Sequence, residues 1–208
     1  MDYILAPPSN AVKLFNEKDL SNWTTRSGDK AGWEAKDGIM HVVPGKGDIM
    51  TKEKFTDFYL HLEWMEPDMP DAKGQAKGNS GVFLQGRYEI QVLDSYGIPV
   101  PGKGDCGAVY NQYATLVNAC KPPLQWQAYD IVFRAPRMGA EGLENARVTA
   151  FQNGMVIHNN IILEGLTGGP IEDKVLEPGP LLLQDHGNLI KYRNIWVVEL
   201  PLKGSDQY

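Results

Sequence analysis

The sequence predicts an all-β protein, built as a two-sheet antiparallel β-sandwich. Short runs of β-branched and aromatic residues recur along the 208 residues, and several of them alternate between apolar and polar side chains. Two-residue turn signals join some of these runs, among them Asp37-Gly38 and Asn153-Gly154. No convincing amphipathic helix is visible, and 22 glycines with 14 prolines indicate frequent turns. Stacked antiparallel sheets account for these observations.

Composition and charge narrow the class of protein. With 42% hydrophobic residues, residues 1–208 can form one β-sandwich domain, in which residues 1–11 are expected to be a flexible N-terminal tether. A net charge of −6 gives no electrostatic footprint for nucleic acid, so no nucleic-acid partner is expected. No apolar run approaches the roughly 20 residues of a membrane helix, so no membrane span is expected.

The strands can be placed in chain order. A hairpin is expected at residues 33–43, with Asp37-Gly38 as its turn, and a second one at the Asn153-Gly154 signal. Roughly ten to thirteen strands are expected in all. Besides the first hairpin and a central one at residues 78–94, they fall at residues 48–52, 57–65, 129–134, 146–152, 155–158, 181–187 and 192–200.

The central hairpin organises the rest of the chain. Its two runs, residues 82–85 and 88–93, flank Gly86-Arg87, which we interpret as a tight turn with glycine in the first central position. In the second run Ile90 and Val92 fall on one face, while Glu89 and Gln91 fall on the other. One face can therefore enter the core while the other presents a carboxylate and an amide. The alternative is a half-exposed hairpin whose polar side chains are merely solvated.

The strand at residues 57–65 carries a second polar face. Its apolar face is formed by alternate residues from Phe58 to Trp64, which leaves His61 and Glu63 together on the other side. A solvated outer face is the alternative for this pair. The following loop, residues 67–78, lacks apolar periodicity, and its position before the central hairpin predicts a rim over a binding face.

Cys106 and Cys120 are the only cysteines. They are compatible with one disulfide closing a 15-residue segment and equally with two buried free thiols. No spacing typical of a zinc site is present. The N-terminus shows neither a basic region nor an adequate apolar run, so either a cytoplasmic protein or a mature chain after signal removal fits.

Seven motifs, in this order, resemble the 3-keto-disaccharide hydrolase family: LFNEKDLSNW, WEAKDGIMHVV, GNSGVFLQGRYEIQVLDSYG, CGAVY, WQAYDIVFRAP, VTAFQNG and LLLQDHGNLIKYRNIW. The resemblance covers about residues 12–200. It implies a concanavalin A-like jelly roll with a sugar-binding sheet, and cleavage of glycosides oxidised to a ketone on the sugar ring. It also implies export, and hence a periplasmic or secreted protein.

The central strand does not carry the pair of carboxylates that ordinary glycosidases use. Glu89 is the only carboxylate on its polar face, its neighbour two residues along is Gln91, and Asp94 has the opposite parity. An unmodified glucan is therefore not expected to be the substrate of this protein.

A keto-sugar changes the requirement, because a ring ketone acidifies the hydrogen on the carbon next to the anomeric centre. One base can then remove this proton, the glycosidic oxygen leaves by β-elimination, and water adds to the product. The catalytic candidates are Glu89, Glu63 and His186, and the substrate-binding candidates are Gln91, Asn79, His61, Gln184 and Arg193. Arg193 or a divalent cation is the candidate to stabilise the enolate oxygen, although no metal-binding loop is recognisable.

The alternative from another class is a non-catalytic carbohydrate-binding module on the same sandwich. The missing second carboxylate favours the module, whereas the Glu, His and Arg residues on polar faces favour the enzyme. Both interpretations have carbohydrate as the ligand, and the sequence leaves the oligomeric state open.

Overall fold

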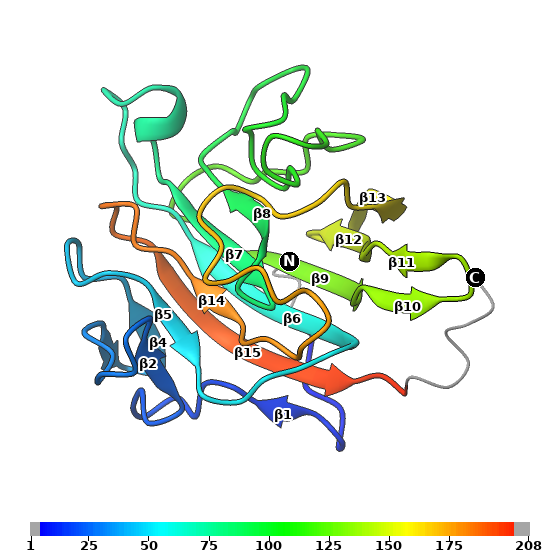
Figure 1. The fold of residues 1–208 in the computed structure, drawn as a ribbon. Helices are drawn as coiled ribbons and strands as arrows, with labels where there is room; N and C mark the ends of the chain where they lie inside the picture. The colour runs from blue at the N-terminus through cyan, green and yellow to red at the C-terminus, as the bar shows by residue number, and fades with distance from the viewer. Residues whose placement is uncertain (1–4, 202–208) are drawn as a thin grey trace.

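The computed structural model describes residues 5–201 as a sandwich of two antiparallel sheets (Figure 1). The larger sheet has the order β13 (Met155–Ile162), β12 (Arg147–Gln152), β9 (Gln127–Arg134), β6 (Phe58–Met65), β15 (Lys191–Glu199), β4 (Ile39–His41) and β3 (Glu34–Lys36), with β1 (Val12–Lys13) also paired to β15. The smaller sheet has the order β2 (Trp23–Thr25), β5 (Ile49–Thr51), β14 (Leu182–Leu183), β7 (Ser80–Leu84) and β8 (Tyr88–Val92). A ribbon of β10 (Arg137–Gly139) and β11 (Gly142–Glu144) and one 3₁₀ turn (Gly74–Ala76) complete the described elements. The all-β sandwich is thus confirmed.

The core lies between the two sheets and is built by strand alternation. Leu60, Leu62 and Trp64 project inward from β6, and Ile90 and Val92 project inward from β8, all fully buried in one apolar cluster. Burial of such side chains contributes about 25 cal/mol for each Å² of apolar surface removed from water. The core faces expected from the sequence are the observed ones, so the opposite face of each strand is fixed as well.

Two hairpins have the expected turns. Asp37 (φ 54°) and Gly38 (φ 74°) join β3 to β4, and Asn153 (φ 53°) and Gly154 (φ 80°) join β12 to β13. Positive φ at both central positions matches the right-handed twist of the flanking strands, which is why these dipeptides predict hairpins.

The central hairpin turns one residue earlier than expected. Its central residues are Gln85 (φ 53°) and Gly86 (φ 65°), closed by a hydrogen bond from the Arg87 amide to the Leu84 carbonyl at 3.0 Å. The interpretation of Gly86-Arg87 as the turn is therefore wrong. Gln85 is held in the left-handed region because its side chain is anchored, with Nε2 donating to the Phe55 carbonyl at 2.9 Å.

Long connections lie outside the sheets. The segment after β8 folds back along this edge strand: the Gly107 amide donates to the Gln91 carbonyl, and the Tyr110 amide donates to the Glu89 carbonyl. In Figure 1 these green loops lie at the top, and the β13–β14 connection, yellow to orange, passes near β7 and β8. Within the described residues, no helix is long and apolar enough to cross a membrane.

The N-terminal tether expected at residues 1–11 lies partly outside the described residues. Within them, the Leu5 carbonyl accepts a hydrogen bond from Asn194 Nδ2 at 3.0 Å, so this part contacts the larger sheet. Cys106 and Cys120 are both free thiols, which answers the question that the sequence left open.

Candidate functional site

A cavity of about 240 Å³ opens on the outer face of the smaller sheet. Strand β8 and the loops around it supply its lining. The lining residues are Gln75, Asn79, Glu89, Gln91, Tyr110, Gly168, Gly169, Gln184 and His186. Its single carboxylic acid, four amides, one phenol and one imidazole match the groups that proteins use to bind and transform sugars.

Glu89 is placed by the alternation of β8 and by the absence of a side chain next to it. A Cβ atom at Gly81, on the adjacent strand β7, would collide with Glu89 Oε1, so glycine is what leaves room for the carboxyl. The Glu89 amide donates to Thr167 Oγ1 at 2.9 Å, which ties the strand to the β13–β14 connection. Among residues 5–201, none donates a hydrogen bond to the Glu89 carboxyl itself.

Burial raises the pKa of Glu89 to about 8, and the negative charge of Asp48 adds to this effect. Glu89 is only 4% exposed, and desolvation disfavours its charged form. A carboxyl with this pKa exchanges a proton near neutral pH, which is the property required of a general acid or base.

Three of the four amides that line the cavity with Glu89 have unpaired oxygens. Asn79 Nδ2 donates to the Gln75 carbonyl at 2.7 Å, and Gln91 Nε2 donates to Gln75 Oε1 at 2.9 Å. In contrast, Asn79 Oδ1, Gln91 Oε1 and Gln184 Oε1 are buried and have no hydrogen-bond partner among the described residues. Buried acceptors are rarely left unpaired, so these three oxygens point to a ligand rich in hydroxyl donors.

The sequence-predicted site residues fall into two groups on opposite sides of the sandwich. Glu89, His186, Gln91, Asn79 and Gln184 lie together around the cavity. Glu63 and His61 on β6, and Arg193 on β15, lie on the outer face of the larger sheet. Since stacked sheets are about 10 Å apart, side chains on the two outer faces cannot reach one substrate. The structure therefore does not bring these three residues to Glu89.

The second group forms a buried ionic network. His61 Nδ1 lies 2.7 Å from Asp130 Oδ1, and Arg193 Nε donates to Glu63 Oε2 at 2.6 Å. Asn194, which has φ 48° at an irregularity of β15, donates to Glu63 Oε1 at 2.9 Å. The alternative of a solvated face is thus wrong, because His61 is 0% and Glu63 1% exposed.

Charge pairing governs the protonation of His61. Burial disfavours its charged form, but hydrogen bonds to Asp130 and Glu63 outweigh this effect, so the pKa of His61 is raised above 6.5. The protonated imidazole therefore compensates two buried carboxylates.

Replacing His61 with alanine is expected to reduce the free energy of unfolding by about 3 kcal/mol, because the change removes the cation that pairs with the buried Asp130 carboxylate. The folded-state pKa is raised, so the ionic contribution is complete below about pH 6.5 and is lost as the pH rises through the folded-state value. Urea unfolding at pH 6 and pH 9 measures this, with a larger deficit expected at pH 6. An equal deficit at both values would show that His61 is neutral in the folded protein.

Four lining residues were not singled out from the sequence: Gln75 and Tyr110, which contribute side chains, and the glycines Gly168 and Gly169. Gln75 comes from the loop at residues 67–78, whose position did predict a rim over a binding face. Tyr110 lines the cavity because its backbone amide donates a hydrogen bond to the Glu89 carbonyl at the edge of β8. No local signal marks this pairing, since it joins a loop to a strand some twenty residues earlier.

No group of three or more His, Cys, Asp or Glu residues suited to hold a metal ion is found in residues 5–201. A cation at this site therefore stays a prediction.

The solved structures similar to this chain include proteins described as glycosyl hydrolases and an alginate lyase. The crystal structure of a protein from Parabacteroides distasonis that is described as a predicted glycosyl hydrolase is similar to this chain. The two chains share 40% sequence identity and superpose with a TM-score of 0.83, over 95% of this chain and 94% of that chain. A second predicted glycosyl hydrolase from the same organism shares 21% identity, with a TM-score of 0.68 and coverage of 92% and 94%. Alginate lyase Aly36B, in complex with alginate tetrasaccharide, shares 11% identity, with a TM-score of 0.53 and coverage of 93% and 98%, which shows the fold alone.

A search of the curated proteins finds no match. The family model described as a 3-keto-alpha-glucoside-1,2-lyase-like domain matches residues 10–198, almost the whole chain. The resemblance found in the motifs is therefore confirmed, and the chain belongs to the 3-keto-alpha-glucoside-1,2-lyase-like family.

Proposed function

We propose that the protein cleaves glycosides whose sugar ring carries a ketone at C3. Family membership and the relative at 40% identity support a carbohydrate-related function. The observation that carries the finer proposal is the isolated, buried carboxyl of Glu89, whose pKa lies near neutrality, among amides with unpaired oxygens.

Ordinary glycoside hydrolysis does not fit this cavity. Retaining enzymes place two carboxyl groups about 5–5.5 Å apart, and inverting enzymes place them about 6.5–9.5 Å apart. Among the residues that line the cavity, Glu89 is the only carboxylic acid. A reaction that needs one acid–base carboxyl fits better than one that needs two.

Elimination next to a ketone is such a reaction. The ionised Glu89 carboxyl takes the proton from C2, and the electron pair of that bond moves onto the ketone oxygen to form an enolate. When this pair returns, the ketone re-forms, the C1–C2 double bond forms, and the bond from C1 to the aglycone oxygen breaks with its electrons leaving on that oxygen. The departing oxygen takes a proton from Tyr110 or His186, and water then adds to the C1–C2 double bond. Hydrogen-bond donors of the lining stabilise the enolate, since Arg193 lies on the other face of the sandwich.

Release of the aglycone tests this proposal. A 3-keto-glucoside and its unoxidised parent are incubated with the protein, with and without chelator. We expect cleavage of the keto compound alone, and sensitivity to chelator would add a cation to the site. Cleavage of the parent sugar would contradict the proposal, because that reaction requires a second carboxylate.

A non-catalytic sugar-binding site is the second candidate, and the three unpaired amide oxygens favour it. Calorimetric titration with 3-keto-glucosides of several aglycones separates the two functions. Binding of these compounds without cleavage of any would assign the protein to this second class.

Replacing Gly81 with alanine is expected to lower the turnover of a 3-keto-glucoside by roughly 100-fold, since the new methyl displaces the Glu89 carboxyl from its position. Steady-state kinetics measures the loss. Gly165→Ala is the matched control, because a Cβ there contacts nothing within 4 Å and its turnover should be unchanged. Normal turnover of the Gly81 variant would show that the position of this carboxyl does not matter.

A further inference from the structure

The two cysteines lie beside one amide group that the proposed reaction does not use. Gln152 Nε2 lies 3.5 Å from Cys106 Sγ and 3.4 Å from Cys120 Sγ. Cys106 also contacts the Tyr129 hydroxyl, at 3.2 Å. The two reduced sulfurs therefore contact the same nitrogen atom and belong to one cluster of side chains.

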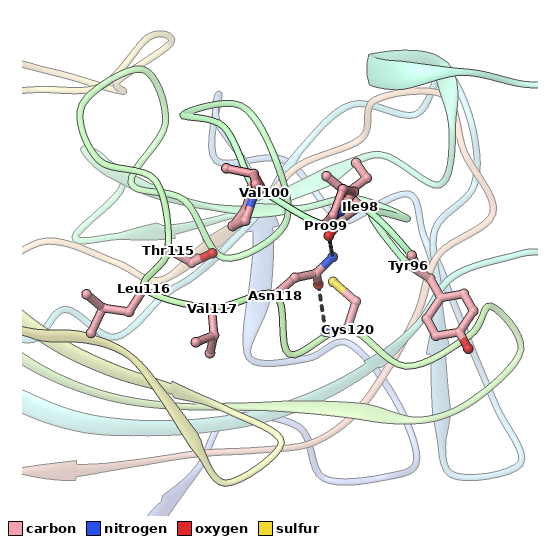
Figure 2. A pocket seen from close by; sticks show the side chains of 11 residues that line it. Tyr96, Ile98, Pro99, Val100, Thr115, Leu116, Val117, Asn118 and Cys120 are labelled. Carbon is pink, nitrogen blue, oxygen red and sulfur yellow. Dashed lines mark hydrogen bonds between the residues drawn. The ribbon is translucent and has the colours of Figure 1, made fainter.

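The two thiols differ in access. Cys120 is partly exposed and lines a pocket of about 550 Å³ between the segments 96–101 and 115–118 (Figure 2). Figure 2 shows its sulfur beside Asn118, whose Oδ1 accepts a hydrogen bond from the Cys120 amide at 3.0 Å. Cys106 is 3% exposed and does not line this pocket. A small reagent in the pocket can therefore reach Cys120 but not Cys106.

Cys106 is also linked to the candidate site. It directly precedes the segment that pairs with β8, in which the Gly107 amide donates to the Gln91 carbonyl at 2.9 Å. Three residues further on, the Tyr110 amide donates to the Glu89 carbonyl at 3.1 Å. A covalent bond at Cys106 would restrain the segment that brings Tyr110 to the cavity.

We propose that Cys120 and Cys106 are a thiol modification site, which small disulfide compounds oxidise through the pocket in front of Cys120. Cys120 loses its proton and attacks one sulfur of the compound, whose sulfur–sulfur bond breaks and releases one thiol. Cys106 then loses its proton and attacks the Cys120 sulfur, which releases the second thiol. The protein gives up two electrons and two protons, and the disulfide compound is reduced to two thiols.

Oxidised glutathione is the probe, and intact mass with a thiol count after unfolding is the measurement. Wild type should lose both thiols and two hydrogens, reversibly with dithiothreitol. Cys106→Ser should retain one glutathione on Cys120, because no second thiol displaces it. Cys120→Ser should react at least about tenfold more slowly than wild type, because Cys106 is buried.

Three results would overturn the proposal: a wild type that keeps both thiols, a wild type that accumulates a glutathione adduct, or a Cys120→Ser variant that reacts at the wild-type rate. Hydrogen exchange tests the link to β8. The backbone amides of Gly107 and Tyr110 should exchange more slowly after oxidation, and unchanged exchange would refute that link. Neither readout requires turnover, so this proposal and the proposed function can fail independently.

Discussion

Replacing Glu89 with glutamine is expected to lower the turnover of a 3-keto-glucoside by about 10³-fold while making the fold more stable. The amide has nearly the shape of the carboxyl but cannot take the C2 proton, and such proton transfer contributes about 10²–10⁴-fold. Binding should persist, because the unpaired oxygens of Asn79, Gln91 and Gln184 remain. Steady-state kinetics and calorimetry measure the two effects separately.

The gain in stability follows from the pKa of Glu89. Its ordinary value of 4.5 is raised to about 8 in the folded state, which therefore holds the proton more tightly than the unfolded chain. The native protein loses stability as the pH rises from 4.5 to 8, and the variant does not. At pH 8 its free energy of unfolding should exceed that of wild type by on the order of 2 kcal/mol, and at pH 4 the gain should vanish.

Glu63→Gln is the matched control, since Glu63 has the same side chain on the other outer face. There the change weakens the contacts with Arg193 and Asn194, so it should reduce stability and leave turnover intact. Equal loss of turnover in both variants would mean that the Glu89 effect is not local. Normal turnover of Glu89→Gln would remove Glu89 as the base.

The fold was predictable because its signals are local. Alternation along each strand places Leu62 and Ile90 in the core, and the Asn153-Gly154 pair specifies its hairpin without help from distant residues. The central turn was missed by one residue because Gln85 is fixed through the Phe55 carbonyl, thirty residues away. No local pattern contains such a contact.

The candidate site was predictable only in part, for the same reason. Alternation gives the face of Glu89 on β8 and of His61 on β6, but not the sheet to which each strand belongs. Along the chain β6 is followed by β7 and β8, yet β6 lies in the larger sheet while β7 and β8 lie in the smaller one. The polar faces of β6 and β8 therefore point away from each other. Convergence of side chains depends on sheet order, which a single sequence does not reveal.

The pH dependence of cleavage should report the ionisation of Glu89. As the base, Glu89 acts in its ionised form, of which roughly a tenth is present at pH 7 when the pKa is about 8. Below pH 8, kcat/KM should therefore rise about tenfold for each pH unit and then level off. Initial rates from pH 5 to 10 give the profile. A profile that falls through pH 8 would instead make Glu89 the acid that protonates the leaving oxygen.

Replacing Asp48 with asparagine separates the two causes of the raised pKa of Glu89, which are burial and the negative charge of Asp48. Burial, the larger cause, remains in this variant, while the negative charge that disfavours ionisation of Glu89 is removed. The midpoint of the profile should move to lower pH, with turnover above the midpoint retained. Asp48 also binds Arg26 and accepts a hydrogen bond from the Asp185 amide, and asparagine keeps an oxygen for the latter contact. An unmoved midpoint would show that burial alone sets the protonation of Glu89.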